Sequence, residues 1–109
     1  MSAELTIISW RDIPAQVVAK AGRRQTARVQ LPERFQEAID EAALRAGLFG
    51  TDEYLAEWRR ETRPCGDDLE VEARAEADRL EAAHPPEALD VLARAGGLRE
   101  AAEPGGVAP

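Results

Sequence analysis

Three short segments within the first third of the chain each predict a β-strand, and in the third of them hydrophobic and polar residues alternate strictly. The first is rich in β-branched and aromatic side chains, and it ends before Asp12-Ile13-Pro14, where proline cannot donate to a strand ladder. Gly22, with Arg23 and Arg24, supplies a turn between the second and third segments. The pattern therefore predicts a three-stranded antiparallel meander, with strands at residues 5–10, 15–21 and 27–31.

Beyond residue 31, apolar residues recur at spacings of three and four, which is typical of amphipathic helices. Pro32 suits a first helical position and Gly47 a helix end. Thr51 is a typical N-cap, and Asp67 or Asp68 is suited to cap a later helix. The predicted helices are at residues 32–46, 51–60, 67–83 and 87–95.

These elements predict an α+β fold, in which a three-stranded antiparallel meander is followed by about four helices and the first helix covers the sheet. A chain of 109 residues has room for one core. We expect a single α+β domain over residues 1–97, made of a core platform (1–64) and an acidic helical extension (65–97). The extension either folds back on the platform or projects from it. Residues 98–109 are dominated by Ala, Glu, Gly and Pro, which predicts a disordered tail.

The net charge of −7 is unevenly distributed along the chain. Residues 1–64 are neutral overall, so all the excess acid lies in residues 65–109. Four cations, Lys20, Arg23, Arg24 and Arg28, gather on the predicted hairpin. They could hold phosphate or an acidic partner, keep an exposed sheet edge soluble, or pair with the acidic helix of the same chain. Nucleic acid is not an expected partner, because a pI near 4.7 opposes binding to phosphate backbones.

The chain has no apolar segment of the roughly 20 residues that a membrane-spanning helix needs, and no typical secretion signal. Its one cysteine, Cys65, lies in a segment that resembles a loop and cannot form an internal disulfide. We therefore expect a cytoplasmic protein without a membrane partner.

No motif in the sequence specifies a reaction. The chain lacks a glycine-rich phosphate loop, a zinc ligand set and a serine nucleophile motif. The carboxylates of residues 70–78 are typical of a solvated helix face, and His84 is suited to a helix C-terminus. The sequence therefore predicts no catalytic residue, no metal site and no cofactor, and it favours a protein that is not an enzyme.

Two groups of residues are candidates for binding, because Trp and Arg are enriched in binding hot spots. One lies at the end of the first strand, at residues 10–14. The other is the basic hairpin, which Arg59 and Arg60 could join. Alternatively, Trp10 belongs to the core and Arg11 and Asp12 form a local ion pair. The candidate residues are Trp10, Arg11, Asp12, Arg23, Arg24, Arg28, Trp58 and Arg59.

Four runs of sequence, residues 6–17, 22–24, 31–40 and 54–59, resemble the small bacterial family called the virulence factor domain. A relative of this family is joined to HEAT-like repeats in conserved virulence factor C, which implies a role in protein interaction. Stand-alone members resembling this chain are often encoded beside methyltetrahydrofolate and corrinoid methyl-transfer enzymes, which implies an accessory part in one-carbon metabolism. The resemblance implies no catalytic residue.

Two hypotheses of different classes follow. In the first, the chain is a non-enzymatic accessory protein whose sheet end binds a protein partner, such as a methyl-transfer or folate enzyme. In the second, the arginines hold a small polyanionic ligand such as a folate with its polyglutamate tail. An enzymatic role, with residues supplied by a partner subunit, is a third hypothesis.

Overall fold

A four-stranded antiparallel sheet forms the centre of the protein, which we describe over residues 3–102 of a computed structural model. The strand order is β3-β2-β1-β4, so the two central strands are also the first two in the chain. The strands are β1 (Ala3–Trp10), β2 (Ile13–Ala21), β3 (Gln25–Gln30) and β4 (Trp58–Cys65).

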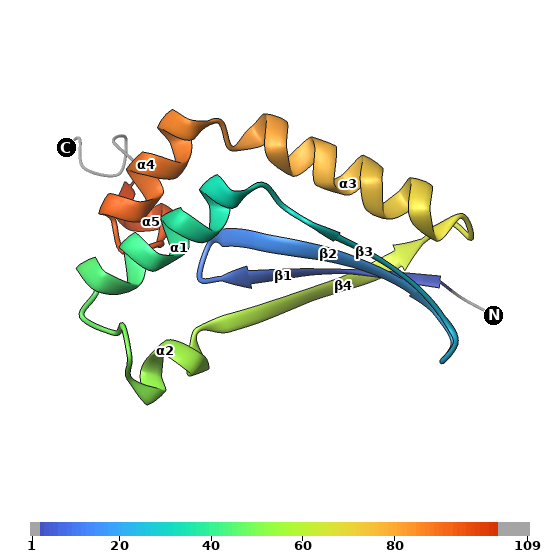
Figure 1. The fold of residues 1–109 in the computed structure, drawn as a ribbon, viewed down its shortest axis with the longest axis horizontal. Coiled ribbons are helices and arrows are strands. Elements are labelled where there is room, and N and C mark those ends of the chain that lie inside the picture. The colour runs from blue at the N-terminus through green and yellow to red at the C-terminus, as the bar shows by residue number, and fades with distance from the viewer. Residues whose placement is uncertain (1–2, 103–109) are drawn as a thin grey trace.

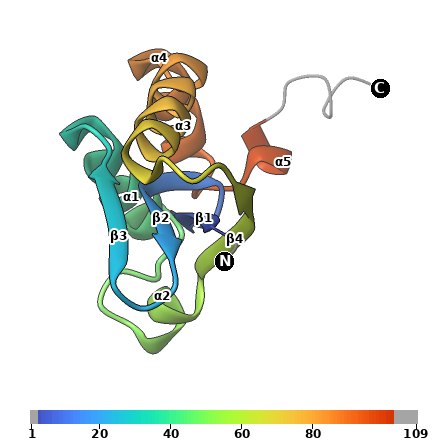
Figure 2. The same ribbon diagram turned by 90° about the vertical axis from the view of Figure 1, so that its right-hand side faces the viewer.

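Helices cover one face of the sheet along its whole length. Figure 1 shows α3 running above the strands, with α1 and α4 side by side at one end and α2 on the opposite side of the sheet at that same end. Figure 2 shows β3 and β4 as the two outer strands. The helices are α1 (Glu33–Arg45), α2 (Asp52–Ala56), α3 (Leu69–Ala83), α4 (Pro86–Arg94) and the short α5 (Arg99–Ala102).

The fourth strand corrects the predicted meander of three strands. Residues 58–60, expected at the end of a helix, begin β4, and Cys65, expected in a loop, ends it. Six of the eight residues of β4 are exposed and charged side chains lie on both of its faces, so no alternating pattern marks it. β4 forms because it hydrogen-bonds to the free edge of β1. The pairing runs from Trp10 opposite Trp58 to Ala3 opposite Cys65.

The boundaries of β2 also differ from the prediction. The strand starts at Ile13 and includes Pro14, which was expected in a turn. Pro14 faces Ser9 at the point where the pairing of β1 and β2 shifts by one residue, and such bulges tolerate proline because a ladder bond is already missing there.

Two of the helices begin at their predicted N-caps. The hydroxyl of Thr51 accepts a hydrogen bond from the backbone N–H of Tyr54, and the carboxylate of Asp68 accepts one from Val71, which confirms both N-caps. The predicted disorder is wrong for Arg99–Ala102, which form α5, because the first N–H of this helix is held by a side chain of the sheet end. The rest of the predicted tail lies outside the described residues.

The acidic helix folds back on the sheet, which decides between the two expected arrangements. Its apolar stripe joins the same core as the strands, and it lies over β2 and β3, whereas α1 packs mainly against α4. The expectation that the first helix covers the sheet is met only in part, since α1 contacts β2 while α3 covers β2 and β3. The buried stripe of α3 consists of Leu69, Ala73, Ala77 and Leu80.

None of the described helices is both long enough and apolar enough to cross a membrane.

Candidate functional site

The turn between β1 and β2 contains a residue in an unusual backbone conformation. Trp10 pairs with Ile13, which leaves only Arg11 and Asp12 to reverse the chain. Arg11 has a φ of 53°, in the left-handed region that residues other than glycine rarely occupy. Such strain persists only where the surroundings hold the residue in place.

Two distant segments of the chain hold Arg11. Its backbone N–H donates to the carbonyl of Glu57 at 3.0 Å, and its Nε donates to the Glu57 carboxylate at 2.8 Å. Its Nη1 donates to the carbonyl of Gly96 at 3.0 Å, and the guanidinium lies 5.1 Å from the ring centre of Trp10. Arg11 is therefore fixed from both sides of the turn.

Asp12 is held by the same two segments. Its backbone N–H donates to the carbonyl of Gly97 at 2.8 Å, and its carboxylate accepts the backbone N–H of Arg99 at 2.7 Å. Arg59 also lies within an ion-pair distance of 3.3 Å. The expected local ion pair between Arg11 and Asp12 is thus replaced by two pairs to other segments.

Trp10 belongs to the core, as one of the two alternatives from the sequence had it, and is therefore not a surface binding residue. Its side chain is 0% exposed, its Nε1 donates to the carbonyl of Tyr54 at 2.8 Å, and its ring stacks on Tyr54 at 5.4 Å between centroids. Trp58 is half-buried and meets the edge of Tyr54 at 6.2 Å. The two indoles therefore anchor the end of the sheet.

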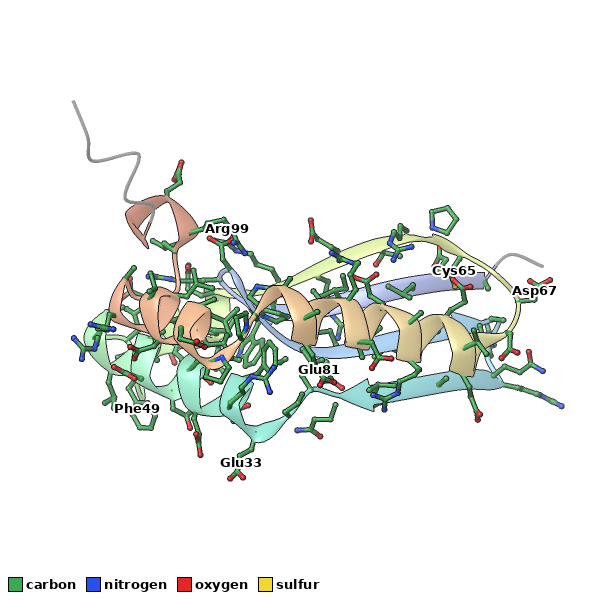
Figure 3. The ribbon with its side chains drawn as sticks, turned by 90° about the horizontal axis from the view of Figure 1, so that it is seen from above. Glu33, Phe49, Cys65, Asp67, Glu81 and Arg99 are labelled. Atoms are coloured by element: carbon green, nitrogen blue, oxygen red, sulfur yellow. The ribbon has the colours of Figure 1, made fainter. Side chains whose placement is uncertain are left out.

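A cleft of about 580 Å³ lies next to this anchored turn. It is lined by the ends of β1 and β4, the last turn of α3 and the start of α5. Arginines from four parts of the chain line it, against two carboxylates, Asp12 and Glu61. Figure 3 labels Arg99 at this end of the sheet. The lining arginines are Arg11, Arg59, Arg60, Arg79 and Arg99.

Some of these arginines are already engaged by acids of the chain. Glu76 on α3 is only 4% exposed and accepts hydrogen bonds from Arg79 and from Arg63 on β4. Burial by itself would raise the pKa of Glu76, but the hydrogen bond and charge of Arg79, with the charge of Arg63, outweigh it and lower that pKa. The side chains of Arg60 and Arg99, by contrast, have no hydrogen bond or ion pair within residues 3–102. The side chain of Arg99 lines the cleft unsatisfied by the described protein, whereas Arg60 points with Thr62 to the open face of the sheet, opposite to Arg59 and Arg63.

His84 also lines the cleft, and it is almost completely buried. Its Nδ1 lies 2.9 Å from the carbonyl of Leu80 and donates to it, whereas its Nε2 has no hydrogen-bond partner among the described residues. Burial lowers the pKa of His84 more than the bond to Leu80 raises it, and the charges of Arg99, Arg79 and Arg34 lower it further. The imidazole is therefore neutral at pH 7.

The structure divides the predicted site residues between two places. Arg11, Asp12 and Arg59 meet at the cleft. Arg23 and Arg24 lie on the hairpin at the other end of β2, roughly 25 Å away for a strand of nine residues. There they share a shallow hollow with Asp67, which Figure 3 labels at the end of the molecule away from Arg99.

Arg28 lies apart from both groups. It sits on the sheet face that α3 leaves open and donates to Gln16 at 3.0 Å. None of the four hairpin cations forms an ion pair with α3 within the described residues. The proposed pairing of the hairpin with the acidic helix is therefore absent from this part of the chain.

Sequence reasoning missed Arg79, Arg99 and His84 as members of the cleft. Arg79 follows a run of acidic residues and looked like part of a solvated helix face, and Arg99 lay in the presumed tail. One available signal was the pair Gly96 and Gly97, because consecutive glycines with positive φ allow a buried, close approach to another segment. The ring of Trp10 lies 3.2 Å from where a Cβ on Gly97 would be.

The fold and the cleft define a small α+β protein with a preformed, arginine-lined surface site held in place by a strained turn. A family model described as "Virulence factor" matches residues 8–93, and the chain belongs to that family. Neither the curated proteins nor the solved structures include a match to this chain.

Proposed function

We propose that this virulence factor family member is a cytoplasmic, non-enzymatic accessory protein whose arginine cleft binds an anionic group. The observation that carries the proposal is the lining of the cleft, where arginines from four parts of the chain outnumber two carboxylates. Guanidinium groups present N–H donors in a planar fork that suits carboxylate and phosphate oxygens.

The charge balance favours binding over repulsion of an anion even after internal pairing is counted. Glu57 pairs with Arg11, and Glu76 is shared by Arg79 and Arg63, so one buried carboxylate meets two arginines. Arg59 and Arg99 stand against Asp12 and Glu61, which leaves a surplus of one positive charge in this region. A single carboxylate or a singly charged phosphate group matches this charge.

The fixed geometry of the cleft supports binding as well. Arg11 and Asp12 are held by hydrogen bonds with residues 57, 96, 97 and 99, so this part of the lining does not have to be ordered when a ligand arrives. Ordering costs about 0.5–1.5 kcal/mol for each long side chain that is immobilised on binding. The cleft avoids part of that cost.

Thermal unfolding with a panel of anions tests the proposal. The panel contains inorganic phosphate, triglutamate and a folate with a polyglutamate tail, the last chosen because of the proposed link to one-carbon metabolism. A ligand at 100 times its Kd should stabilise the protein by about 2.7 kcal/mol. The double variant Arg59→Gln with Arg99→Gln should lose this effect, whereas Arg45→Gln, which changes an exposed ion pair on α1, should keep it. Absence of stabilisation by every anion would remove the proposal.

We also propose that the protein acts beside a protein partner, for which a methyl-transfer or folate enzyme is the hypothesis suggested by the family resemblance. Co-sedimentation of the purified chain with such an enzyme, with and without the folate ligand, tests that part independently. No complex in either condition would contradict it.

A further inference from the structure

A second hollow lies at the same end of the molecule but outside the arginine cleft, and its chemistry is the opposite. It encloses about 480 Å³ between α1, the following loop and α2. Figure 3 shows Phe49, at its rim, on a different side of the molecule from Arg99. The residues that line it are Asp40, Phe49, Gly50, Thr51, Asp52, Tyr54 and Leu55.

Large apolar side chains stand exposed around this hollow. Phe49 is 56% exposed and Leu55 is 65% exposed, although removing such large apolar side chains from water is favourable. Exposed apolar groups clustered in this way mark binding surfaces more often than scattered ones do. The hollow is thus a surface that burial by a partner would stabilise.

Backbone hydrogen bonds define the path of the loop that carries Phe49. The N–H of Leu48 donates to the carbonyl of Ala43 at 2.9 Å, and the N–H of Thr51 donates to the carbonyl of Leu48 at 3.0 Å. Gly47 and Gly50, with φ of 73° and 79°, make the two bends between these bonds. The backbone therefore holds Phe49 away from the core.

Tyr54 gives the hollow a fixed floor. Its ring is clamped between the stacked indole of Trp10 and the edge-on indole of Trp58. Burial and the nearby charge of Asp40 raise the pKa of Tyr54, which is consistent with an enclosed ring beside a carboxylate. An incoming side chain would meet a preformed aromatic surface.

The charged groups of the hollow are acidic only. Asp40 and Asp52 line it, and neither forms an ion pair with another residue in the range 3–102. Asp40 accepts one hydrogen bond, from Gln36 at 2.9 Å, so its charge stays available. An apolar anchor entering the hollow would therefore be favoured if it carried a positive charge beside it.

We infer that this hollow is the docking site for a segment of a partner protein in which an apolar side chain stands next to Lys or Arg. The apolar side chain packs between Phe49, Tyr54 and Leu55, and the cation reaches Asp40 or Asp52. The inference rests on residues that the arginine cleft does not use, so either site can fail without the other.

Three capped tetrapeptides, titrated into the ¹⁵N-labelled full chain, test the inference. The sequences are Ala-Phe-Lys-Arg, the acidic counterpart Ala-Phe-Glu-Glu, and the polar counterpart Ala-Ser-Lys-Arg. Only the first should cause saturable shifts of the amides at residues 49–55, in the millimolar range expected for so short a peptide. Absence of such shifts, or equal binding of the acidic peptide, would overturn the inference.

Variants assign the effect to the hollow. Phe49→Ser with Leu55→Ser should weaken binding at least tenfold, and Asp40→Asn with Asp52→Asn should remove the preference for the basic peptide. Val71→Ser, which changes an equally exposed apolar residue on α3, should have no effect. Circular dichroism should give the same folded signal for all variants, since the substituted side chains lie outside the core. Self-association of the wild type that the Phe49 and Leu55 variant abolishes would identify a second copy as the occupant and overturn the proposed partner.

Discussion

The two ends of the β1–β2–β3 meander contain similar residues, yet the protein uses them in different ways. The turn after β1 holds Arg11 beside Asp12, and the hairpin after β2 holds Arg23 and Arg24 beside Gly22. Each reversal contains a residue with positive φ, of 53° at Arg11 and 66° at Gly22. The first turn is bonded to residues 57, 96, 97 and 99, whereas Arg23 and Arg24 are exposed and have no ion pair within the described chain.

The comparison teaches that the chemistry of a turn arises from the segments that reach it. At the first turn, the residues from 54 to 59 and from 96 to 99 supply carbonyls, a carboxylate and two further arginines. At the hairpin only Asp67 comes near. A strained arginine is stable at the first turn because it is held on both sides, and the exposed hairpin relies on glycine for its positive φ.

The largest expected effect comes from removing the anchor of the first turn. Trp10→Ala should destabilise the protein by about 3–5 kcal/mol, because it leaves a large cavity and removes the hydrogen bond to Tyr54. Trp10→Phe keeps most of the apolar volume and should cost clearly less. Urea denaturation of both variants measures the difference, and equal stability of Trp10→Ala and the wild type would show that the turn end does not depend on this residue.

A methyl group on Gly97 should have the next largest effect. This residue has a φ of 86°, and a Cβ there would lie 3.2 Å from the Trp10 ring. Backbone strain and the tight contact together predict a loss of roughly 2–4 kcal/mol for Gly97→Ala. Gly22→Ala on the exposed hairpin, where φ is 66°, should cost about 1–2 kcal/mol from the backbone strain. Denaturation curves that rank the two glycines the other way would contradict the difference between the ends.

Between pH 7.5 and pH 5.5, the pH dependence of stability should report mainly on His84, which is the only histidine in the chain. Its pKa is lowered in the folded state, so the unfolded chain binds the proton more tightly. The contribution of His84 to the free energy of unfolding is complete above the pKa of the unfolded chain, about 6.5. It is lost as the pH falls below that value, by at most about 1.4 kcal/mol per pH unit. Denaturation at pH 7.5 and pH 5.5 measures this loss.

His84→Asn is the control for the pH experiment, because its amide can still donate to the carbonyl of Leu80 without titrating. This variant should have a flatter stability profile between pH 7.5 and pH 5.5. Glu76 affects a lower range, since its depressed pKa makes its contribution disappear only under more acidic conditions. An unchanged profile in the His84 variant would show that the buried imidazole is not the titrating group.

The smallest expected effect is at the hairpin. Arg23→Gln with Arg24→Gln should change the free energy of unfolding by less than about 0.5 kcal/mol, as is usual for exposed residues without specific partners. The same denaturation assay applies. A loss above 1 kcal/mol would mean that these arginines have structural contacts comparable with those of Arg11.

Local sequence patterns predicted the elements whose stability is local. Alternation marked β3, Gly22 marked its turn, and Thr51 and Asp68 marked helix starts, because each depends on neighbours a few residues away. β4 could not be predicted in this way, since an edge strand with charges on both faces is specified by the strand it pairs with.

The candidate site was predictable only in its local part. Arg11 and Asp12 were identified from the grouping at the end of the first strand, and Arg59 as an addition to the basic hairpin, but Arg79, Arg99 and His84 reach the cleft through the packing of α3 and the turn at Gly96 and Gly97. The hypothesis that joined Arg23 and Arg24 to this sheet end is not met by the structure, because the hairpin lies at the other end of β2.

The most direct test compares the arginines of the two ends in one titration with inorganic phosphate, followed by NMR of the labelled chain. The wild type and the variant Arg23→Gln with Arg24→Gln should bind equally, with saturable shifts at residues 11, 12, 59 and 99. The variant Arg59→Gln with Arg99→Gln should bind at least tenfold more weakly. Loss of binding in the hairpin variant, with binding retained in the cleft variant, would contradict the account.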